Sequence, residues 1–161
     1  MAHACTAAGR DVNEVTLLAV SKTFPADAVR EAHAAGQLAF GENYIQEAVE
    51  KMALLADLPL EWHCIGPIQS NKTRLVAQHF AWAHTIDRLK IAQRLSEQRP
   101  PGLPPLQVCI QVNVDGGATK AGVAPGETLD LAREIAALPR VVRRAHVVGP
   151  EGLAHRQQRD F

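Results

Sequence analysis

The stretch VTLLAVSK, residues 15–22, shows the pattern from which the fold can be predicted. Its first six residues form a short, continuous apolar run, which is typical of a strand buried on both faces of a parallel sheet. A helix-like stretch follows at residues 25–35, and Gly36 stands where that helix would end. The sequence therefore predicts a strand and then a helix, with Lys22 just after the strand.

The same order of strand and helix recurs along the chain. Further strands are predicted at residues 38–41, 62–65, 82–86, 106–114 and 141–148, and further helices at residues 45–55, 71–80, 88–98 and 125–138. Strands that alternate with helices through short connections predict a parallel sheet with covering helices. Two architectures have this pattern, an open doubly wound sheet and a (β/α)8 barrel, also called a TIM barrel.

Polar residues at the ends of the predicted strands favour the barrel. They are Lys22, Asn43, His63, Asp87 and Asn113. A barrel gathers the carboxyl ends of all its strands on one face. An open sheet gathers functional residues only near its switch point.

The overall composition is that of an ordinary globular domain. The 161 residues suit one domain, and 17 basic residues balance 17 acidic ones. This balance gives no reason to expect nucleic acid or an anionic membrane as a partner.

The N-terminus and the cysteines predict a cytoplasmic location. The first residues lack the apolar core of a signal peptide, and no apolar run is long enough for a membrane span. The three cysteines are widely scattered, which argues against a disulfide framework. His63 and Cys64 are adjacent, but no second ligand pair has a suitable spacing, so we expect no metal site.

Lys22 and Asn43 are the first candidates for ligand binding. An amine at a barrel mouth, next to an apolar strand, is partly desolvated, which favours the neutral form that attacks aldehydes. Asn43 follows Gly41 and could donate to and accept from a planar ligand. The plainer alternatives are a solvated lysine and an asparagine that caps the next helix.

A second group of candidates follows the third predicted strand. Gln69, Asn71 and Lys72 stand with Ser70 at the expected start of a helix, where an anion or a polar ligand edge can bind. Helix capping is the alternative. After the fifth strand, Asn113 and Lys120 border a glycine-containing loop, and Lys120 could reach a bound aldehyde or a phosphate. A tight turn without a binding role is equally compatible with that loop.

The order of these motifs resembles one known family. LLAVSKT (17–23) is followed by FGENY (40–44), EWHCIGPIQSNK (61–72), HTIDR (84–88) and IQVNV (110–114) with a K-x-G loop (120–122). This series resembles the pyridoxal 5′-phosphate (PLP) homeostasis proteins, whose fold is like the barrel domain of alanine racemase. The resemblance extends from about Ala7 to Leu138.

The resemblance implies a non-catalytic protein that binds PLP and either buffers it or passes it to PLP-accepting apo-enzymes. By this resemblance Lys22 forms the Schiff base with PLP, and Asn43 lies near the cofactor ring. The segment with Gln69, Asn71 and Lys72 is similar to the family's signature, and Lys120 is similar to the loop lysine that could move PLP on or off. His63 and Asn113, which lie at strand ends on the same face, complete the expected cofactor-binding set. Family members are monomers.

The resemblance ends near Arg140. We expect a partial barrel at residues 1–140, with about six of eight β/α units, and a divergent tail at residues 141–161. The phosphate-binding loops of such barrels follow the last two strands, and their motifs are not found here. The hypothesis is a truncated or frameshifted gene, whose open barrel would expose strand edges and favour association. A PLP-dependent enzyme of alanine racemase-like fold and a non-functional fragment are the alternatives.

Overall fold

The computed structural model describes residues 1–117, 119–144, 147–148 and 154–155. Six parallel strands form the main sheet: β1 (Ala19–Val20), β2 (Ala39–Glu42), β3 (Glu61–Cys64), β4 (Trp82–Ile86), β5 (Leu106–Ile110) and β6 (Val141–Arg144). Each strand pairs with the next one along the chain. This strand order is that of a barrel, because a doubly wound sheet reverses its order at a switch point. The predicted fold class, an incomplete (β/α) barrel, is confirmed.

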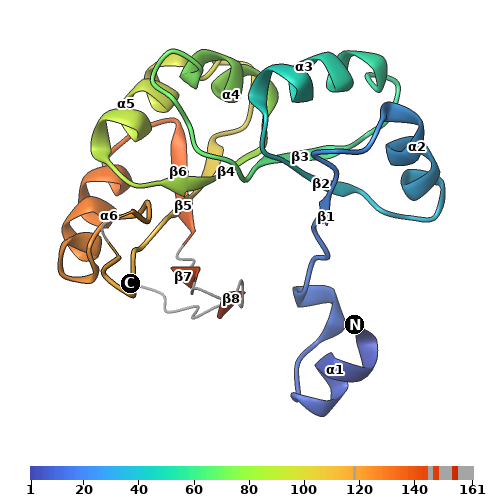
Figure 1. Cartoon of the computed structure of the whole chain (residues 1–161), viewed down its shortest axis with the longest axis horizontal. Helices are drawn as coiled ribbons and strands as arrows, with labels where there is room; N and C mark the ends of the chain where they lie inside the picture. Colours follow the sequence, from blue (N-terminus) through green and yellow to red (C-terminus); the bar gives the residue numbers. More distant parts are fainter. Residues whose placement is uncertain (118, 145–146, 149–153, 156–161) are drawn as a thin grey trace.

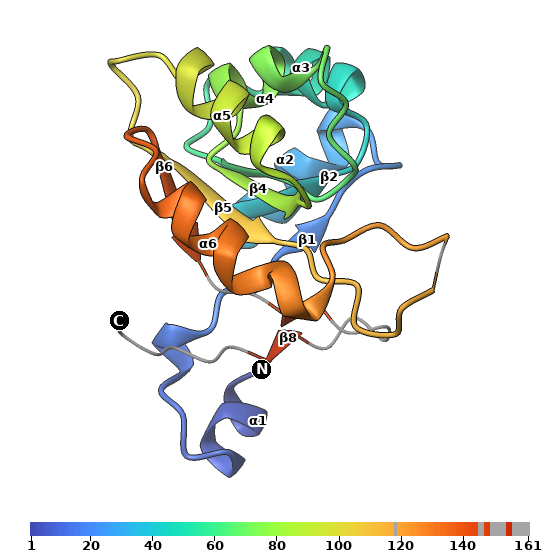
Figure 2. The same cartoon turned by 90° about the vertical axis from the view of Figure 1, so that its left-hand side faces the viewer.

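Five helices follow the first five strands: α2 (Ala26–Ala34), α3 (Ile45–Leu54), α4 (Thr73–His79), α5 (Leu89–Gln98) and α6 (Thr128–Ala136). Figure 1 shows them along the outer side of the curved sheet, while α1 (Ala2–Ala7) lies apart from them. Two 3-10 helices precede β1 and α6, η1 (Val12–Glu14) and η2 (Pro125–Glu127). In Figure 2 the connection from β5 to α6 reaches well away from the sheet.

The hydrophobic core fills the space between the sheet and its helices. Its largest fully buried side chains include Phe40 of β2 and Leu95 of α5. The apolar face predicted for residues 45–55 is confirmed, since Ile45, Ala48 and Met52 of α3 are buried. Gly36 ends α2 as expected and adopts a φ of 96°, a conformation that favours glycine. The core therefore fixes the sheet from its outer side.

Three predicted strands are shorter than expected. β1 has two residues instead of six, because its described ladder has a neighbour on one side only, β2. β5 ends at Ile110, since Val112 instead pairs with Val123 of its own following loop. The stretch 141–148 is not one strand: β6 belongs to the main sheet, and β7 (Val147–Val148) pairs antiparallel with β8 (Ala154–His155).

The predicted division at residue 140 falls directly before β6, so the main sheet extends four residues beyond it. The division itself stays a prediction, and most of the predicted tail lies outside the described residues. Among the helices that are described, none combines the length and the apolar character needed to cross a bilayer.

Candidate functional site

Lys22 and Asn43 lie at neighbouring strand ends. Val20 is in register with Gly41, so Lys22 and Asn43, each two residues further along the chain, come next to each other at the same rim. The Lys22 side chain is exposed, and the Asn43 side chain is half-buried. Within the described ranges neither side chain has a hydrogen-bond partner, so both polar groups are available to a ligand.

The desolvation predicted for Lys22 is absent from the structure. Lys22 is exposed because β1 is an edge of the described sheet and has β2 as its neighbour on one side only. Val20, in the same strand, is 47% exposed for the same reason. The amine is thus accessible rather than enclosed.

Gly66 brings the segment after β3 against Asn43. A Cβ at Gly66 would lie 2.3 Å from the Asn43 carbonyl oxygen, so a larger residue would push these two backbones apart. The segment with Gln69, Asn71 and Lys72 follows directly. A close glycine contact therefore joins the rims of β2 and β3.

The three candidate residues in the segment after β3 differ in their exposure and in their hydrogen bonds. Gln69 and Asn71 are exposed, with no side-chain partner among the described residues, whereas Lys72 is half-buried and its Nζ donates to Gln46 Oε1 at 3.3 Å. The helix predicted to begin at residue 71 begins at Thr73. Asn71 and Lys72 thus belong to the turn before α4 and extend the rim of β2 and β3.

Asn113 and Lys120 organise the loop after β5. The Asn113 Nδ2 donates to the carbonyl oxygens of Gly117 and Lys120, at 3.0 and 3.2 Å. Its Oδ1 is buried and has no partner among the described residues. Lys120 Nζ forms an ion pair with Asp115, and this hydrogen bond lowers the pKa of the Asp115 carboxyl. Both residues lie at the predicted end of the sheet, but β4 separates them from the rim of β3.

His63 lies inside the sheet rather than beyond its rim. It is buried, its Nδ1 is 2.9 Å from His84 Nε2, and its Nε2 is 3.0 Å from Glu61 Oε1. Its ring stacks on Trp82 with an interplanar angle of 9°. Burial lowers the pKa of His63, and the Glu61 carboxylate opposes this shift only partly. Both ring nitrogens are engaged, so His63 could bind a ligand only by giving up one of these contacts.

A buried polar cluster beside Lys22 was not predicted. Glu42 is 1% exposed, and its Oε1 accepts from Ser21 Oγ at 2.7 Å and from Lys51 Nζ at 2.6 Å. Lys51 Nζ also donates to the Ser21 carbonyl oxygen at 2.7 Å. The available signal was Glu42 itself, a carboxylate at the end of a strand that is otherwise buried. Its partner Lys51 comes from α3, a contact that residue spacing alone does not reveal.

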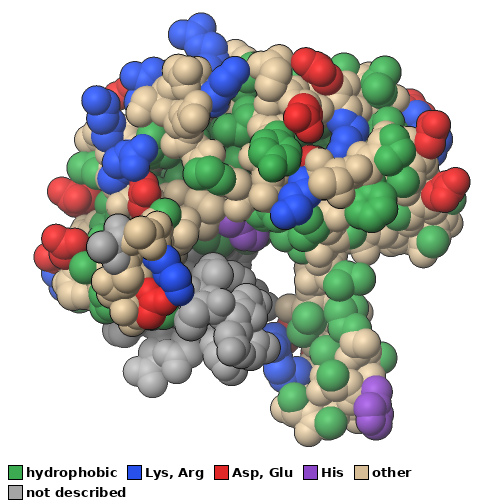
Figure 3. Space-filling view, viewed as in Figure 1, with side chains coloured by type: hydrophobic (Ala, Val, Ile, Leu, Met, Phe, Trp, Pro, Cys, Tyr) green, Lys and Arg blue, Asp and Glu red, His purple; other side chains and the backbone are tan. Residues whose placement is uncertain are grey.

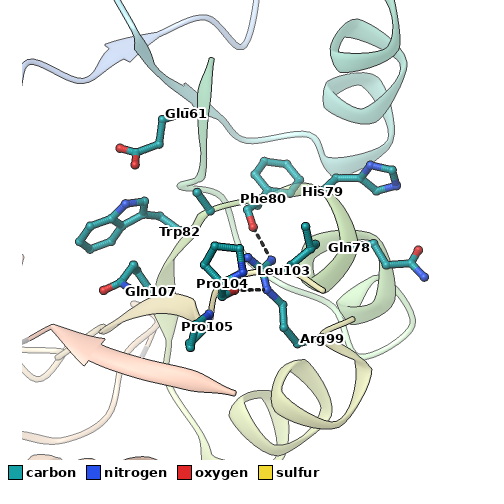
Figure 4. Close-up of a pocket in the computed structure, with 11 residues that line it drawn as sticks. Glu61, Gln78, His79, Phe80, Trp82, Arg99, Leu103, Pro104, Pro105 and Gln107 are labelled. Carbon is teal, nitrogen blue, oxygen red and sulfur yellow. Dashed lines mark hydrogen bonds between the residues drawn. The ribbon is translucent and has the colours of Figure 1, made fainter. Parts of the chain in front are cut away.

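At the opposite end of the sheet, Arg99 holds several backbone segments together by hydrogen bonds. Its guanidinium donates to the carbonyl oxygens of Ala77, Phe80 and Pro104 at 2.7–2.8 Å. Figure 4 shows it beside a mainly apolar cavity of about 340 Å³, next to Leu103 and Pro104. This cavity lies at the amino ends of β4 and β5. Glu61 and Trp82, which line it, also contact His63, whereas the other predicted site residues are not part of its lining.

The cysteines and acidic groups do not suggest metal chemistry. Burial raises the pKa of the Cys64 thiol to about 12, so the thiolate that would bind a metal is disfavoured. In the part of the chain that the structure describes, no group of three His, Cys, Asp or Glu side chains could hold a metal ion.

The sequence matches known proteins along most of its length. Residues 1–151 match the family model of the alanine racemase N-terminal domain. The pyridoxal phosphate homeostasis protein of Pseudomonas aeruginosa is 64% identical over 154 residues, which are 96% of this chain and 67% of that protein. The Escherichia coli protein of the same name is 54% identical, and the match covers 91% of this chain and 64% of that protein.

This chain belongs to the pyridoxal phosphate homeostasis protein family. The solved structure of PipY from Synechococcus elongatus with PLP bound agrees with this assignment. It is 38% identical with a TM-score of 0.76, and the match covers 94% of this chain and 71% of PipY. The chain spans about two thirds or less of the length of the curated family members described above.

Proposed function

We propose that this protein binds PLP through Lys22 and takes part in PLP homeostasis without catalysing a reaction. The observation that carries this proposal is the exposed Lys22 amine, unpaired among the described residues, beside the equally unpaired Asn43 amide. PLP supplies an aldehyde, which condenses reversibly with a primary amine. Family membership adds support, since the relatives carry the name of homeostasis proteins and PipY has been solved with PLP.

The residues at the rim fit the polar parts of PLP. Asn43, which can both donate and accept, would meet the ring. Gln69, Asn71 and Lys72 would meet polar or anionic groups on the side of β3. Asn113 would hold its loop in place, so that Lys120 could approach from the side of β5. His63 would take part only after breaking a contact with Glu61 or His84.

A carrier rather than an enzyme is supported by the names of the relatives, which are homeostasis proteins. A racemase needs a proton donor and acceptor on the other face of the cofactor ring. Tyr44 is the single tyrosine of the sequence, and its side chain is 56% exposed at the start of α3. Incubation of the PLP-loaded protein with L-alanine, followed by chiral chromatography, should find no D-alanine. Its formation at a rate that depends on protein concentration would overturn this part of the proposal.

The proposed cellular setting is the cytoplasm, with PLP-accepting apo-enzymes as partners. The three cysteines are buried and free, which suits a reducing compartment. Val20 and Val142, on the two outermost strands of the described sheet, are 47% and 41% exposed. These apolar edges favour association over the monomeric state predicted from the family. Sedimentation at several protein concentrations tests which state prevails.

Titration with PLP tests the main proposal. Mixing should produce a new absorbance band, and reduction with borohydride should leave the label on Lys22, as peptide mapping would show. Lys22→Ala should abolish the band. Lys90→Ala is the matched control, because Lys90 is an exposed lysine at the start of α5, after β4, and β2 and β3 separate that strand from β1. A label on another lysine, or an unchanged band in Lys22→Ala, would disprove the assignment.

A further inference from the structure

The cluster of Ser21, Glu42 and Lys51 adjoins the proposed Schiff-base lysine on the helix-covered side of the sheet. Ser21 precedes Lys22, and its backbone is held on both sides. Its N–H donates to the Gly41 carbonyl oxygen at 2.9 Å, and its own carbonyl oxygen accepts from Lys51 Nζ at 2.7 Å. The peptide group that leads into Lys22 is therefore fixed by β2 and by α3.

The cluster is separated from the barrel-lining side of the sheet. A Cβ at Gly41 would meet Ile65 and Leu18 side chains, whereas the next residue, Glu42, contacts Lys51 of α3 on the helix-covered side. Successive side chains of a strand point to opposite faces. The cluster thus holds the strand end from the helix-covered side of the sheet and would not itself contact a ligand at the rim.

Burying the Glu42 carboxylate costs free energy of folding, and apolar side chains at these positions would avoid that cost. Glu42 is fully buried, and its second carboxylate oxygen, Oε2, has no partner among the described residues. Replacing a buried ion pair with apolar side chains of similar size is often neutral or stabilising. A half-satisfied carboxylate at this position is therefore better explained by geometry at the site than by stability.

We propose that Ser21, Glu42 and Lys51 form a positioning network that sets the backbone, and thereby the amine, of Lys22 for attack on an aldehyde. This inference rests on the proposed function. Because β1 has only two ladder residues, the strand end would otherwise be weakly held. The Lys51–Ser21 contact replaces the ladder bonds that a longer strand would provide.

The test compares the rate at which Lys22 reacts, not only its final occupancy. Glu42→Gln keeps an oxygen for Ser21 but removes the charge that holds Lys51, and Lys51→Met removes both bonds of the ammonium group. Misplacement of a reacting group by about 1 Å can cost up to roughly 100-fold, so we expect both variants to condense with PLP at least about tenfold more slowly. Lys51→Arg keeps the charge and should recover a large part of the rate.

Two controls separate this proposal from a general loss of structure. Asp57→Asn breaks the ion pair with Arg30, which also links α2 to the end of α3 but lies away from Lys22, and it should leave the rate unchanged. The pH profile of Lys22 modification by pyridoxal and borohydride, followed by peptide mapping, should shift in Glu42→Gln but not in Asp57→Asn. Thermal melts report whether each variant is folded at the assay temperature, and Ser21→Ala provides a milder change if the others are not.

The outcomes are distinguishable from those of the proposed function. If wild type labels Lys22 and folded Glu42→Gln and Ser21→Ala label it at the same rate and with the same pH profile, the positioning role is wrong while PLP binding stands. If wild type does not label Lys22, the proposed function fails and the network has no amine to position. Slower labelling with recovery in Lys51→Arg supports the network.

Discussion

Two polar sites at opposite ends of the sheet differ in how fully their side chains are hydrogen-bonded. At the amino ends of β4 and β5, Arg99 is buried and its guanidinium is bonded to three carbonyl oxygens. At the carboxyl ends of β1 and β2, Lys22 and Asn43 have no partner among the described residues. Satisfied polar groups stabilise a fold, whereas unsatisfied and accessible ones are free to bind. Barrel proteins show the same division between a stabilising face and a functional face.

The concave side of the sheet connects these two ends. Figure 3 shows the molecule hollowed on this side, between α1 and the part that carries the helices, and a histidine side chain comes to the surface at the upper edge of the hollow. In the middle of the sheet His63 of β3 is in register with Trp82 of β4, and their rings stack. In this middle region His63 is buried, as Arg99 is, and it is also a titratable group, as Lys22 is. Substitutions in each of these regions can test how strictly stability and binding are divided.

The largest effect is expected at the amino-terminal end. Arg99→Met would leave the carbonyl oxygens of Ala77, Phe80 and Pro104 without their donor, so we expect the free energy of unfolding to fall by about 3 kcal/mol. Chemical denaturation measures this. In the remaining folded protein, Lys22 should label with PLP as in wild type.

Arg88→Met is the matched control for this prediction. Arg88 is exposed and pairs with its neighbour Asp87, a kind of contact that contributes little. Its removal should change the unfolding free energy by less than about 0.5 kcal/mol. Equal destabilisation by the two variants would contradict the assignment of Arg99 as a structural anchor.

A smaller, pH-dependent effect is expected from His63. Its folded-state pKa is lowered by burial, so below the ordinary value of 6.5 the unfolded chain binds a proton that the folded chain does not. Stability should therefore fall as the pH decreases from about 7.5 to 5.5, by about 1.4 kcal/mol for each unit of pKa shift. Urea denaturation at a series of pH values measures the slope.

His63→Gln should flatten that slope, whereas His79→Gln should not, because His79 is exposed on α4. The groups that face His63 are Glu61, His84 and Trp82. The carboxylate of Glu61 would favour a charged ring, so Glu61→Gln should steepen the fall in stability. An unchanged slope in His63→Gln would show that another group controls the acid sensitivity.

The sequence predicted the repeating architecture well and the contacts between elements poorly. Apolar runs such as residues 82–86 became strands with the predicted bounds, because a central strand is specified by its own buried residues. β1 could not be predicted correctly, since its length depends on how many neighbours the sheet provides. Likewise, the position of Lys22 followed from the pattern, but its exposure depends on what covers the strand.

In the candidate site, too, contacts between different elements could not be predicted from the sequence. Sequence order and resemblance could predict that Asn43 and the segment at residues 69–72 follow strands that end at the same rim as the strand before Lys22, because parallel strands end at one rim. They could not show that Lys51, on the helix after β2, reaches back to Ser21. Such long-range polar contacts depend on side-chain direction, which residue spacing does not encode.

The smallest effect is expected from the Asn113 side chain at the functional rim. Asn113→Ala would remove two hydrogen bonds to the loop, but it would also remove a buried oxygen that has no partner among the described residues. These terms oppose each other, so the global unfolding free energy should change by less than about 1 kcal/mol. Amide hydrogen exchange at Gly117 and Lys120 should nevertheless become faster, because the loop loses its anchor. Asn71→Ala, which removes an exposed side chain, should change neither quantity. A large global loss in Asn113→Ala would mean that this loop belongs to the stabilising half of the molecule, and that the division between the two ends of the sheet does not extend to β5.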